Sequence, residues 1–453
     1  MSSQTSLDFR TNAAGAVKDG VLRQAMRQAT DTIGTKRSDA MESVDFTALR
    51  EKASAIRMEV LDNLPAYIER FTAKATQAGA SVHRAADAGS ANTIIAGILK
   101  SNNVRMVAKG KSMISEETHL NAHLEKEGFE VVETDLGEYI IQLAGETPSH
   151  ILVPAIHKNR QQVGRLFAEK LGADYSEDPQ VLTKIARKAL REKFLTADAG
   201  ISGANFAIAE SGSLVIFTNE GNGRMVTSVP PLHIAILSIE KILPSLADLP
   251  TFMRLLPRSA TGQMLTSYVS ILTGNRKEGD ATGARELHIV LLDNGRSEIV
   301  KGDCREMLKC IRCGACMNVC PVYRTVGGHA YGWTYPGPMG IVLTTLLTGM
   351  AGSHPLVDAS TLCGACNDAC PVKVPLQEMI LKQRVRRVSE GFSPAGVSMG
   401  MRLFGAAVKS PLLFSFGERL VGWLWSLLRR AGGENVVGRL PRPAKSPFSR
   451  RMP

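Results

Sequence analysis

Seven of the eight cysteines lie in two short runs, and this placement constrains the fold more than any other feature of the 453-residue chain. The first run has the spacing C-x2-C-x2-C-x3-C-P, and the second ends in the same way, as C-x2-C-x3-C-P. Three cysteines from one tight turn can bind one [4Fe–4S] cluster, and the cysteine before the proline binds the other cluster of a two-cluster protein. We therefore expect two clusters in electron-transfer contact. The cysteines are Cys310, Cys313, Cys316 and Cys320, followed by Cys363, Cys366 and Cys370.

The two runs form an internal repeat, because glycine, alanine, proline and valine match between residues 310–322 and 360–372 as well as the sulfurs. Crossing the ligands assigns Cys310, Cys313, Cys316 and Cys370 to cluster one. Cluster two then receives Cys363, Cys366 and Cys320. Its fourth ligand is missing, because Ser360 occupies the repeat position of Cys310.

Three interpretations of the missing ligand remain open. Cys304 lies six residues before Cys310 and is either a spare core thiol, which we favour, or the fourth ligand. Ser360 is the competing oxygen ligand by its place in the repeat. In the third interpretation, one iron stays open to a partner or a substrate.

Zinc and disulfides are the ordinary alternatives for such cysteines. Zinc sites close with four ligands, usually as two C-x2-C pairs, which is not this pattern. Disulfides need an oxidising compartment, and residues 1–37 show no apolar secretory segment. No run of about twenty apolar residues predicts a transmembrane helix. These features predict a cytoplasmic iron–sulfur protein.

Basic charge is concentrated at the C-terminal end. Residues 381–453 contain 14 Lys and Arg and three acidic residues, so the whole formal net charge of +11 resides there. Residues 412–428 add apolar and aromatic side chains, including Trp423 and Trp425. We expect a docking segment for a partner subunit, with peripheral contact at the inner membrane as an alternative. Nucleic acid is not expected, because no recognisable binding motif accompanies the charge.

Upstream of the cysteines, short apolar segments alternate with helical patterns, which predicts an α/β domain with a largely parallel sheet. The domain prediction is an N-terminal helical region at 1–90, an α/β domain at 91–298, a small helical two-cluster ferredoxin-type module at 299–393 and the basic tail at 394–453. Strands are expected at 104–108, 129–133, 149–154, 205–210, 213–218 and 287–292, and helices at 116–127, 161–171 and 179–197.

Several segments outside the cysteines carry a family resemblance. Residues 310–316, 327–332, 335–338 and 363–366 are similar to the LutB family, the iron–sulfur subunits of lactate-utilisation systems. Residues 109–117, 209–214 and 218–224 resemble that family's LUD domain, and the likeness covers roughly residues 60–420.

The resemblance has implications for fold and function. It implies a LUD fold like that of NagB, ribose-5-phosphate isomerase and CoA-transferase domains. It implies electron transfer in the oxidation of L-lactate to pyruvate. It also implies two partners, a cysteine-rich redox subunit and a second LUD protein.

A substrate pocket is predicted in the α/β domain, where Glu220, Arg224 and Lys111 could meet near Ser211–Ser213 and bind a 2-hydroxy acid. The alternative is that these residues are a turn and a charged first helical turn, together with Lys109, Glu116 and Glu117. His233 is expected to be a hydrogen-bonded core residue, whereas His329 is either a turn residue or a donor to a cluster sulfide.

Two other functions compete with electron transfer. A hydro-lyase or isomerase would use the open iron of cluster two as a Lewis acid, and a non-catalytic regulator would use the clusters to sense oxygen or iron. No Gly-x-Gly-x-x-Gly follows an expected strand, so the sequence shows no nicotinamide or flavin fingerprint.

Overall fold

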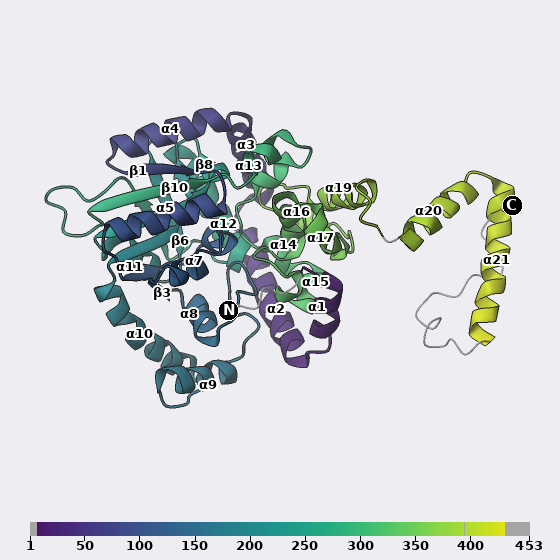
Figure 1. The fold of residues 1–453 in the computed structure, drawn as a ribbon, viewed down its shortest axis with the longest axis horizontal. Coiled ribbons are helices and arrows are strands. Elements are labelled where there is room, and N and C mark those ends of the chain that lie inside the picture. Colours follow the sequence, from purple (N-terminus) through teal and green to yellow (C-terminus); the bar gives the residue numbers. More distant parts are fainter. Residues whose placement is uncertain (1–6, 394, 431–453) are drawn as a thin grey trace. The chain divides into compact units, whose positions relative to one another are not determined.

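Residues 7–393 and 395–430 are described by the structure, which is a computed structural model (Figure 1). The chain divides into two compact units, residues 1–384 and 385–453. The first contains the sheets, both cysteine runs and the helices that surround them.

A six-stranded sheet, parallel throughout, forms the centre of the first unit. A second, four-stranded sheet lies beside it in the order β8-β5-β6-β9. The predicted α/β class with a largely parallel sheet is confirmed. In spatial order the large sheet contains β1 (Ser81–Ala85), β10 (Glu286–Leu292), β7 (Leu232–Ser238), β4 (Ala199–Gly203), β2 (Met106–Lys109) and β3 (Glu130–Glu133), and the small sheet contains β8 (Ile242–Leu243), β5 (Phe206–Ile208), β6 (Ser213–Thr218) and β9 (Tyr268–Leu272).

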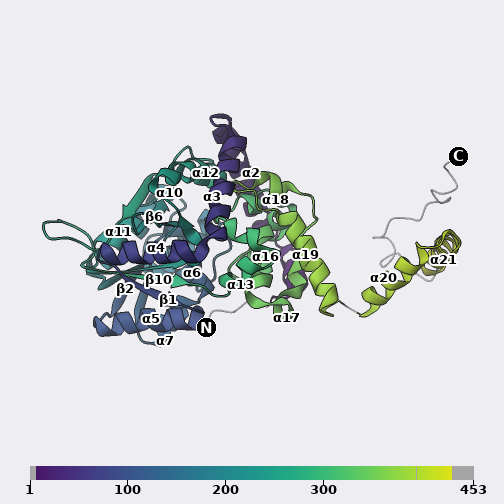
Figure 2. The ribbon, with the colours of Figure 1, turned by 90° about the horizontal axis from the view of Figure 1, so that it is seen from above.

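Strand β7 shows why the large sheet is covered on both faces. Its alternate residues enter different cores, since successive side chains of a strand point to opposite sides. Ile234 and Ile236 pack with α5 (Ala88–Ser101) and α7 (Leu120–Lys126), whereas Ala235 and Leu237 pack with α4 (Leu64–Gln77). Figure 2 shows α4 and α5 on opposite faces. Further helices of this region are α6 (Met113–Glu117), α8 (Leu136–Ala144), α9 (Arg160–Leu171), α10 (Pro179–Thr196), α11 (Asn222–Ser228) and α12 (Leu249–Thr261).

The cluster module consists of short helices around the cysteines. It shares one core with α1 (Phe9–Ala16), α2 (Gly20–Glu42) and α3 (Phe46–Asp62), because Phe9, Met26 and Ile56 pack with its cysteines and tyrosines. The N-terminal helices therefore support the module although they precede the α/β part. Its elements are α13 (Arg296–Lys301), η3 (Arg305–Lys309), α14 (Ala315–Asn318), α15 (Pro321–Val326), η4 (His329–Tyr331), α16 (Gly337–Thr348), α17 (Met350–Ser353), η5 (His354–Asp358), α18 (Ala365–Ala369) and α19 (Leu376–Ser389).

The strand expected at 149–154 is absent, and this prediction is wrong. The segment is a bend in which His150 Nδ1 accepts hydrogen bonds from the backbone N–H groups of Leu152 (2.9 Å) and Val153 (3.1 Å). These donors are bound locally and are not offered to a neighbouring strand. The helix expected at 116–127 is interrupted at His119, whose φ of 52° is left-handed.

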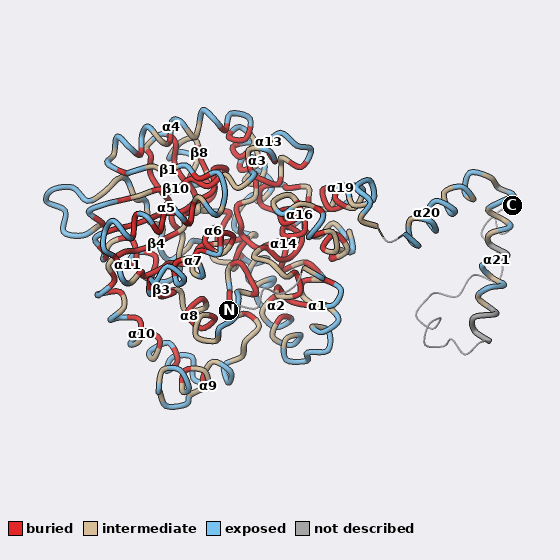
Figure 3. Tube along the Cα trace, in the orientation of Figure 1, coloured by how far each residue is buried: buried red, intermediate tan, exposed pale blue. Residues whose placement is uncertain are grey.

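The second unit contains α20 (Ala395–Ala407) and α21 (Pro411–Arg430). Large apolar side chains remain exposed on both helices, among them Phe404, Phe416 and Trp423. Figure 3 shows stretches of exposed residues along α20 and α21. The predicted apolar segment of the tail thus lies within a helix, and the Pro/Arg-rich stretch from Arg439 lies outside the described residues. Within the described part of the chain, the helices are too short or too polar to cross a bilayer.

Candidate iron–sulfur centres

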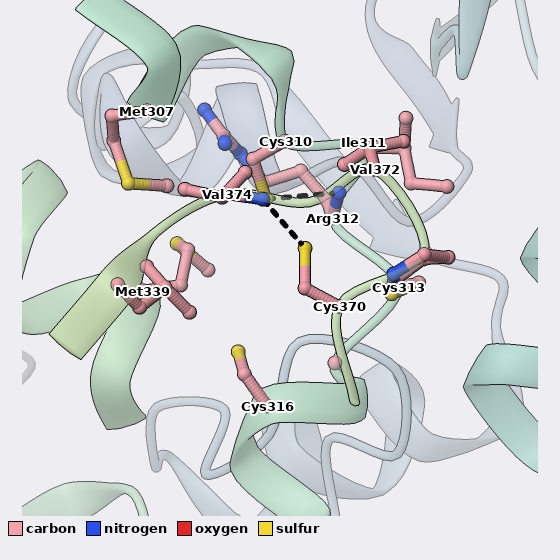
Figure 4. Close-up of a pocket in the computed structure, with 13 residues that line it drawn as sticks. Met307, Cys310, Ile311, Arg312, Cys313, Cys316, Met339, Cys370, Val372 and Val374 are labelled. Carbon is pink, nitrogen blue, oxygen red and sulfur yellow. Dashed lines mark hydrogen bonds between the residues drawn. The ribbon is translucent and has the colours of Figure 1, made fainter. Parts of the chain in front are cut away.

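Four cysteines from both runs line one cavity. Cys310, Cys313 and Cys316 come from the first run, and Cys370 comes from the second (Figure 4). The rest of the wall is largely apolar and includes Met307, Met339, Val372 and Val374. The structure thus brings together the four residues assigned to cluster one by sequence.

Left-handed residues give both cysteine loops the same shape. Arg312 (φ 59°) and Gly314 (φ 73°) flank Cys313, and Leu362 (φ 56°) and Gly364 (φ 84°) occupy the matching positions around Cys363. Arginine and leucine rarely adopt this conformation, so the surrounding structure must hold them there. The repeat seen in the sequence is therefore also a repeat of backbone conformation.

Backbone donors reach the cavity sulfurs. The N–H of Arg312 donates to Cys310 Sγ (3.4 Å), and the N–H of Val374 donates to Cys370 Sγ (3.3 Å). Such bonds stabilise negative charge on a cluster's thiolates and raise its reduction potential. Burial, followed by the neighbouring cysteines, raises the pKa of the Cys316 thiol well above its ordinary value. A thiolate without a bound metal is thus disfavoured here, and bound iron would compensate for the negative charge of the buried sulfur.

Three remaining cysteines form the second group. Cys320, Cys363 and Cys366 interact electrostatically, and Cys366 also interacts with Cys316 of the first group. Burial and Cys320 raise the pKa of Cys366 to about 12. Cys363 is exposed, and the backbone N–H of Ala365 lowers the pKa of its thiol. The group predicted for cluster two therefore lies beside the first and reaches the surface.

Ser360 repeats the local geometry of Cys310. The N–H of Leu362 donates to Ser360 Oγ (3.1 Å), as the N–H of Arg312 donates to Cys310 Sγ. Arg384 fixes the serine backbone from α19 through its bond to the carbonyl oxygen of Ser360 (2.6 Å). The hydroxyl thus occupies the position that the repeat gives to a ligand atom.

Cys304 has different surroundings. Its side chain is buried, and its Sγ accepts a hydrogen bond from Gln383 Nε2 (3.5 Å). Burial, together with Asp303, raises the pKa of the thiol. These neighbours favour the interpretation of Cys304 as a core residue.

A buried ionic network connects the sheet to the first cysteine loop. Arg312 of that loop pairs with Glu240 (3.3 Å). Glu240 lies in η1 (Ile239–Lys241), the turn that follows β7, and also pairs with Arg296 (3.0 Å). Arg296 in turn pairs with Glu117 (2.7 Å), which accepts a hydrogen bond from the Tyr335 hydroxyl (2.6 Å). Burial alone would raise the pKa of Glu240, but Arg296 and Arg312 lower it to about 2. Sequence reasoning missed this network, because its members are far apart along the chain.

The predicted substrate pocket is only partly assembled. Lys111 and Glu220 interact electrostatically, beside Asp135 and Glu138. Arg224 is exposed on α11, and among the described residues no hydrogen bond or ion pair joins its side chain to Lys111 or Glu220. Desolvation and the Asp135 carboxylate raise the pKa of Glu220 to about 7. Carboxylates outnumber cations around Lys111, which favours a structural charge cluster over an anion site.

The other singled-out residues have ordinary partners. Lys109 is buried and pairs with Glu133 (2.5 Å) and Glu116 (3.3 Å). His233 is buried and hydrogen-bonded to the Ser202 hydroxyl (2.8 Å), as predicted for a core histidine. His329 Nε2 lies 2.7 Å from the carbonyl oxygen of Thr147, in a contact with the α/β part of the chain.

Comparisons with known proteins match both parts of this description. The LUD domain model matches residues 68–292, and the 4Fe-4S dicluster domain model matches residues 306–374. A crystal structure of a DUF162 family protein from Deinococcus radiodurans matches 51% of this chain and 98% of its own at 15% identity, with a TM-score of 0.30.

Curated relatives match nearly the whole chain. Lactate utilization protein B of Shouchella clausii is 43% identical over 97% of this chain and 95% of its own. The protein of the same name from Bacillus subtilis is 42% identical over 97% and 91%. An uncharacterized electron transport protein of Escherichia coli, YkgF, is 42% identical over 92% and 88%. The chain therefore belongs to the Lactate utilization protein B family, in which a LUD domain is joined to a 4Fe-4S dicluster domain.

Proposed function

We propose that this protein carries electrons from the oxidation of L-lactate to pyruvate through two [4Fe–4S] clusters to a redox partner. The observation that supports it most is the single cavity lined by Cys310, Cys313, Cys316 and Cys370, which crosses the two runs. Cluster two would be held by Cys320, Cys363 and Cys366. Lactate oxidation releases two electrons and two protons, and each bound cluster accepts one electron at a time.

The chain's own residues shape both sites for this role. The apolar wall and the two N–H donors would restrict water around a bound cluster one and stabilise the negative charge of an added electron. Because Cys363 is exposed, cluster two would lie near the surface, which would suit exchange with another subunit. The expected partners are a cysteine-rich redox subunit and a second LUD protein. The basic, apolar tail would serve as the docking segment. Electrostatic attraction would bring a partner subunit to it, and apolar contact would prolong the complex.

Anaerobic purification followed by reduction with L-lactate tests this function. The protein should contain about eight iron and eight sulfide, as two such clusters require. L-lactate should reduce the clusters when the partner subunits are present. A chain cut after Gly391 keeps every cysteine, so it should retain its clusters but deliver electrons more slowly.

Four outcomes would contradict the proposal or one of its parts. Iron near four atoms per chain, or stoichiometric zinc, would rule out two clusters. A lactate-induced spectral shift without electron flow would favour the hydro-lyase or isomerase. Clusters that lactate never reduces in the assembled complex would favour the sensor. Full-rate delivery by the shortened chain would remove the docking role from the tail.

We further propose that Ser360 Oγ completes cluster two. Replacing Ser360 with cysteine should slow oxidative loss of iron from that cluster by at least about tenfold, because a thiolate binds iron more tightly than a hydroxyl. Replacing it with alanine should hasten the loss. The [3Fe–4S] EPR signal that appears during ferricyanide oxidation measures the rate.

Cys304→Ser is the matched control. Its Oγ can still accept the hydrogen bond from Gln383, so both clusters should keep their ordinary stability. A labile second cluster in Cys304→Ser, together with an unaltered one in Ser360→Ala, would make Cys304 the fourth ligand instead.

A further inference from the structure

A second cavity, of about 520 Å³, opens within the first unit where the LUD part meets the cluster module. The LUD part contributes Met113, Glu116 and His119, and the module contributes His329 and Trp333. Small-molecule and cofactor sites commonly measure roughly 300–1,000 Å³. Lactate would fill only a fraction of this space, so the cavity suits a larger ligand than the proposed substrate.

Charge on the wall argues against an anionic ligand. Among the described residues that line the cavity there is no lysine or arginine, and the carboxylate is that of Glu116. Glu116 lies 3.3 Å from the ammonium group of Lys109, which also pairs with Glu133 (2.5 Å), so the wall carries no excess of positive charge. A carboxylate or phosphate would therefore meet no permanent cation on the wall, only the imidazoles of His119 and His329. The lining favours a neutral molecule.

The wall also suits a flat ring. Trp333 packs against Tyr335 in an edge-on arrangement, with ring centroids 5.6 Å apart, and Tyr335 is fixed by its bond to Glu117. Met113 and Pro148 supply further apolar surface. A rigid indole beside apolar side chains and two imidazoles combines aromatic stacking with hydrogen bonding to a carbonyl oxygen.

One short helix connects this cavity to the cysteine sites. His329, at the start of η4, lines the cavity. Tyr331, at its end, is fully buried, and its phenol interacts electrostatically with Cys320 and Cys316. Helix η4 thus connects the cavity wall to a side chain beside two residues proposed to hold the clusters.

A row of titratable side chains connects His329 on the cavity wall to the partly exposed Glu146. The rings of His329 and His157 lie edge to face, with centroids 4.6 Å apart, and His157 Nε2 bonds to Glu146 (2.8 Å). Lys158 also pairs with Glu146 (2.6 Å), whose side chain is partly exposed. His157 Nδ1 is buried with no hydrogen-bond partner within the described structure. These groups can pass protons between solvent and the cavity.

We propose that this cavity binds a neutral quinone-type ring and that His119 and His329 supply the protons for its reduction. The quinone gains two electrons and two protons, and its two carbonyl oxygens become the hydroxyls of a hydroquinone. The electrons come from the two clusters, so the reduction rests on the proposed function, whereas the binding does not. A quinone would thus be the electron acceptor of the two clusters.

Trp333 reports on binding in the full chain. The chain has three tryptophans, so Trp423→Phe with Trp425→Phe leaves Trp333 as the sole one. The soluble naphthoquinone 2-methyl-1,4-naphthoquinone should quench its fluorescence to saturation. Thr348→Phe, which fills part of the cavity, should weaken binding at least about tenfold. Thr183→Phe is the matched control, because Thr183 on α10 is exposed and bonds to the carbonyl four residues back as Thr348 does.

Electron transfer tests the two histidines. His119→Asn keeps a residue that tolerates the left-handed backbone, and His329→Gln keeps a side-chain donor to Thr147. Each should slow reoxidation of dithionite-reduced clusters by the naphthoquinone at least about tenfold, the lower end of the range for general acid catalysis. Reoxidation by ferricyanide needs no proton and should keep its rate. His123→Asn, one turn along α7, should match the parent protein.

The results separate the two proposals. Absence of quenching by the naphthoquinone, saturation by L-lactate, or binding of FMN in its place would overturn the quinone assignment. Unchanged naphthoquinone rates in both histidine variants would overturn their role as proton donors. A chain without clusters would fail the proposed function in its iron content, yet Trp333 fluorescence would still decide whether the quinone binds.

Discussion

Replacing Cys370 with alanine should abolish the cluster held by the first cysteine run, although that run keeps its own cysteines. Cys370 lines the cavity with Cys310, Cys313 and Cys316, so its loss leaves three thiols around a site built for four. The second run retains Cys363 and Cys366. Total iron should therefore fall from about eight to about four atoms per chain, as expected for one remaining [4Fe–4S] cluster. Iron and sulfide analysis with EPR of the reduced protein measures the change.

Two variants make this result specific. Cys320→Ala should instead weaken cluster two, since Cys320 interacts with Cys363 and Cys366. Cys304→Ala removes a buried thiol that lies beside Gln383, and it should leave the iron content unchanged. If Cys370→Ala kept the cluster of the first run and lost that of the second, the ligands would be uncrossed and the cavity would need another occupant.

The cysteine geometry was accessible from the sequence because the motif is local. Spacing within each run fixes which residues share a turn, and the matching glycines 314 and 364 permit the same left-handed conformation in both loops. The parallel sheet was also accessible, since short apolar segments alternating with helices leave few other folds. Strand β6 was predicted at its observed bounds.

Elements that depend on distant partners escaped prediction. Strand β4 contains two glycines and lies between β2 and β7, so its pairing reflects its burial and not its composition. At residues 149–154, the imidazole of His150 accepts hydrogen bonds from the backbone N–H groups that a strand would need for pairing. The 520 Å³ cavity collects residues from Leu7 to Gly352, and no spacing along the chain could have indicated it. Long-range contacts leave no periodic signal.

Replacing Glu240 with glutamine should destabilise the folded protein by about 3–5 kcal/mol, the usual cost of removing one partner of a buried ion pair. The variant keeps the side chain's size but leaves Arg296 and Arg312 without the carboxylate that each now contacts. Urea unfolding followed by circular dichroism measures the loss. Glu298→Gln, which breaks an exposed pair with Lys301, should cost no more than about 1 kcal/mol.

The pH dependence of the same variant separates charge from packing. Glu240 has its pKa lowered from 4.5 to about 2, so the folded state binds its proton less readily than the unfolded state. Its contribution to stability is therefore complete above roughly pH 5 and is lost as the pH falls toward 2. Glu240→Gln should lack this part of the acid sensitivity, so the parent and variant unfolding curves should converge at low pH. A constant difference between them from pH 7 to pH 3 would show that Glu240 acts through its shape, and the network would not be an electrostatic connection between the sheet and the first cysteine loop.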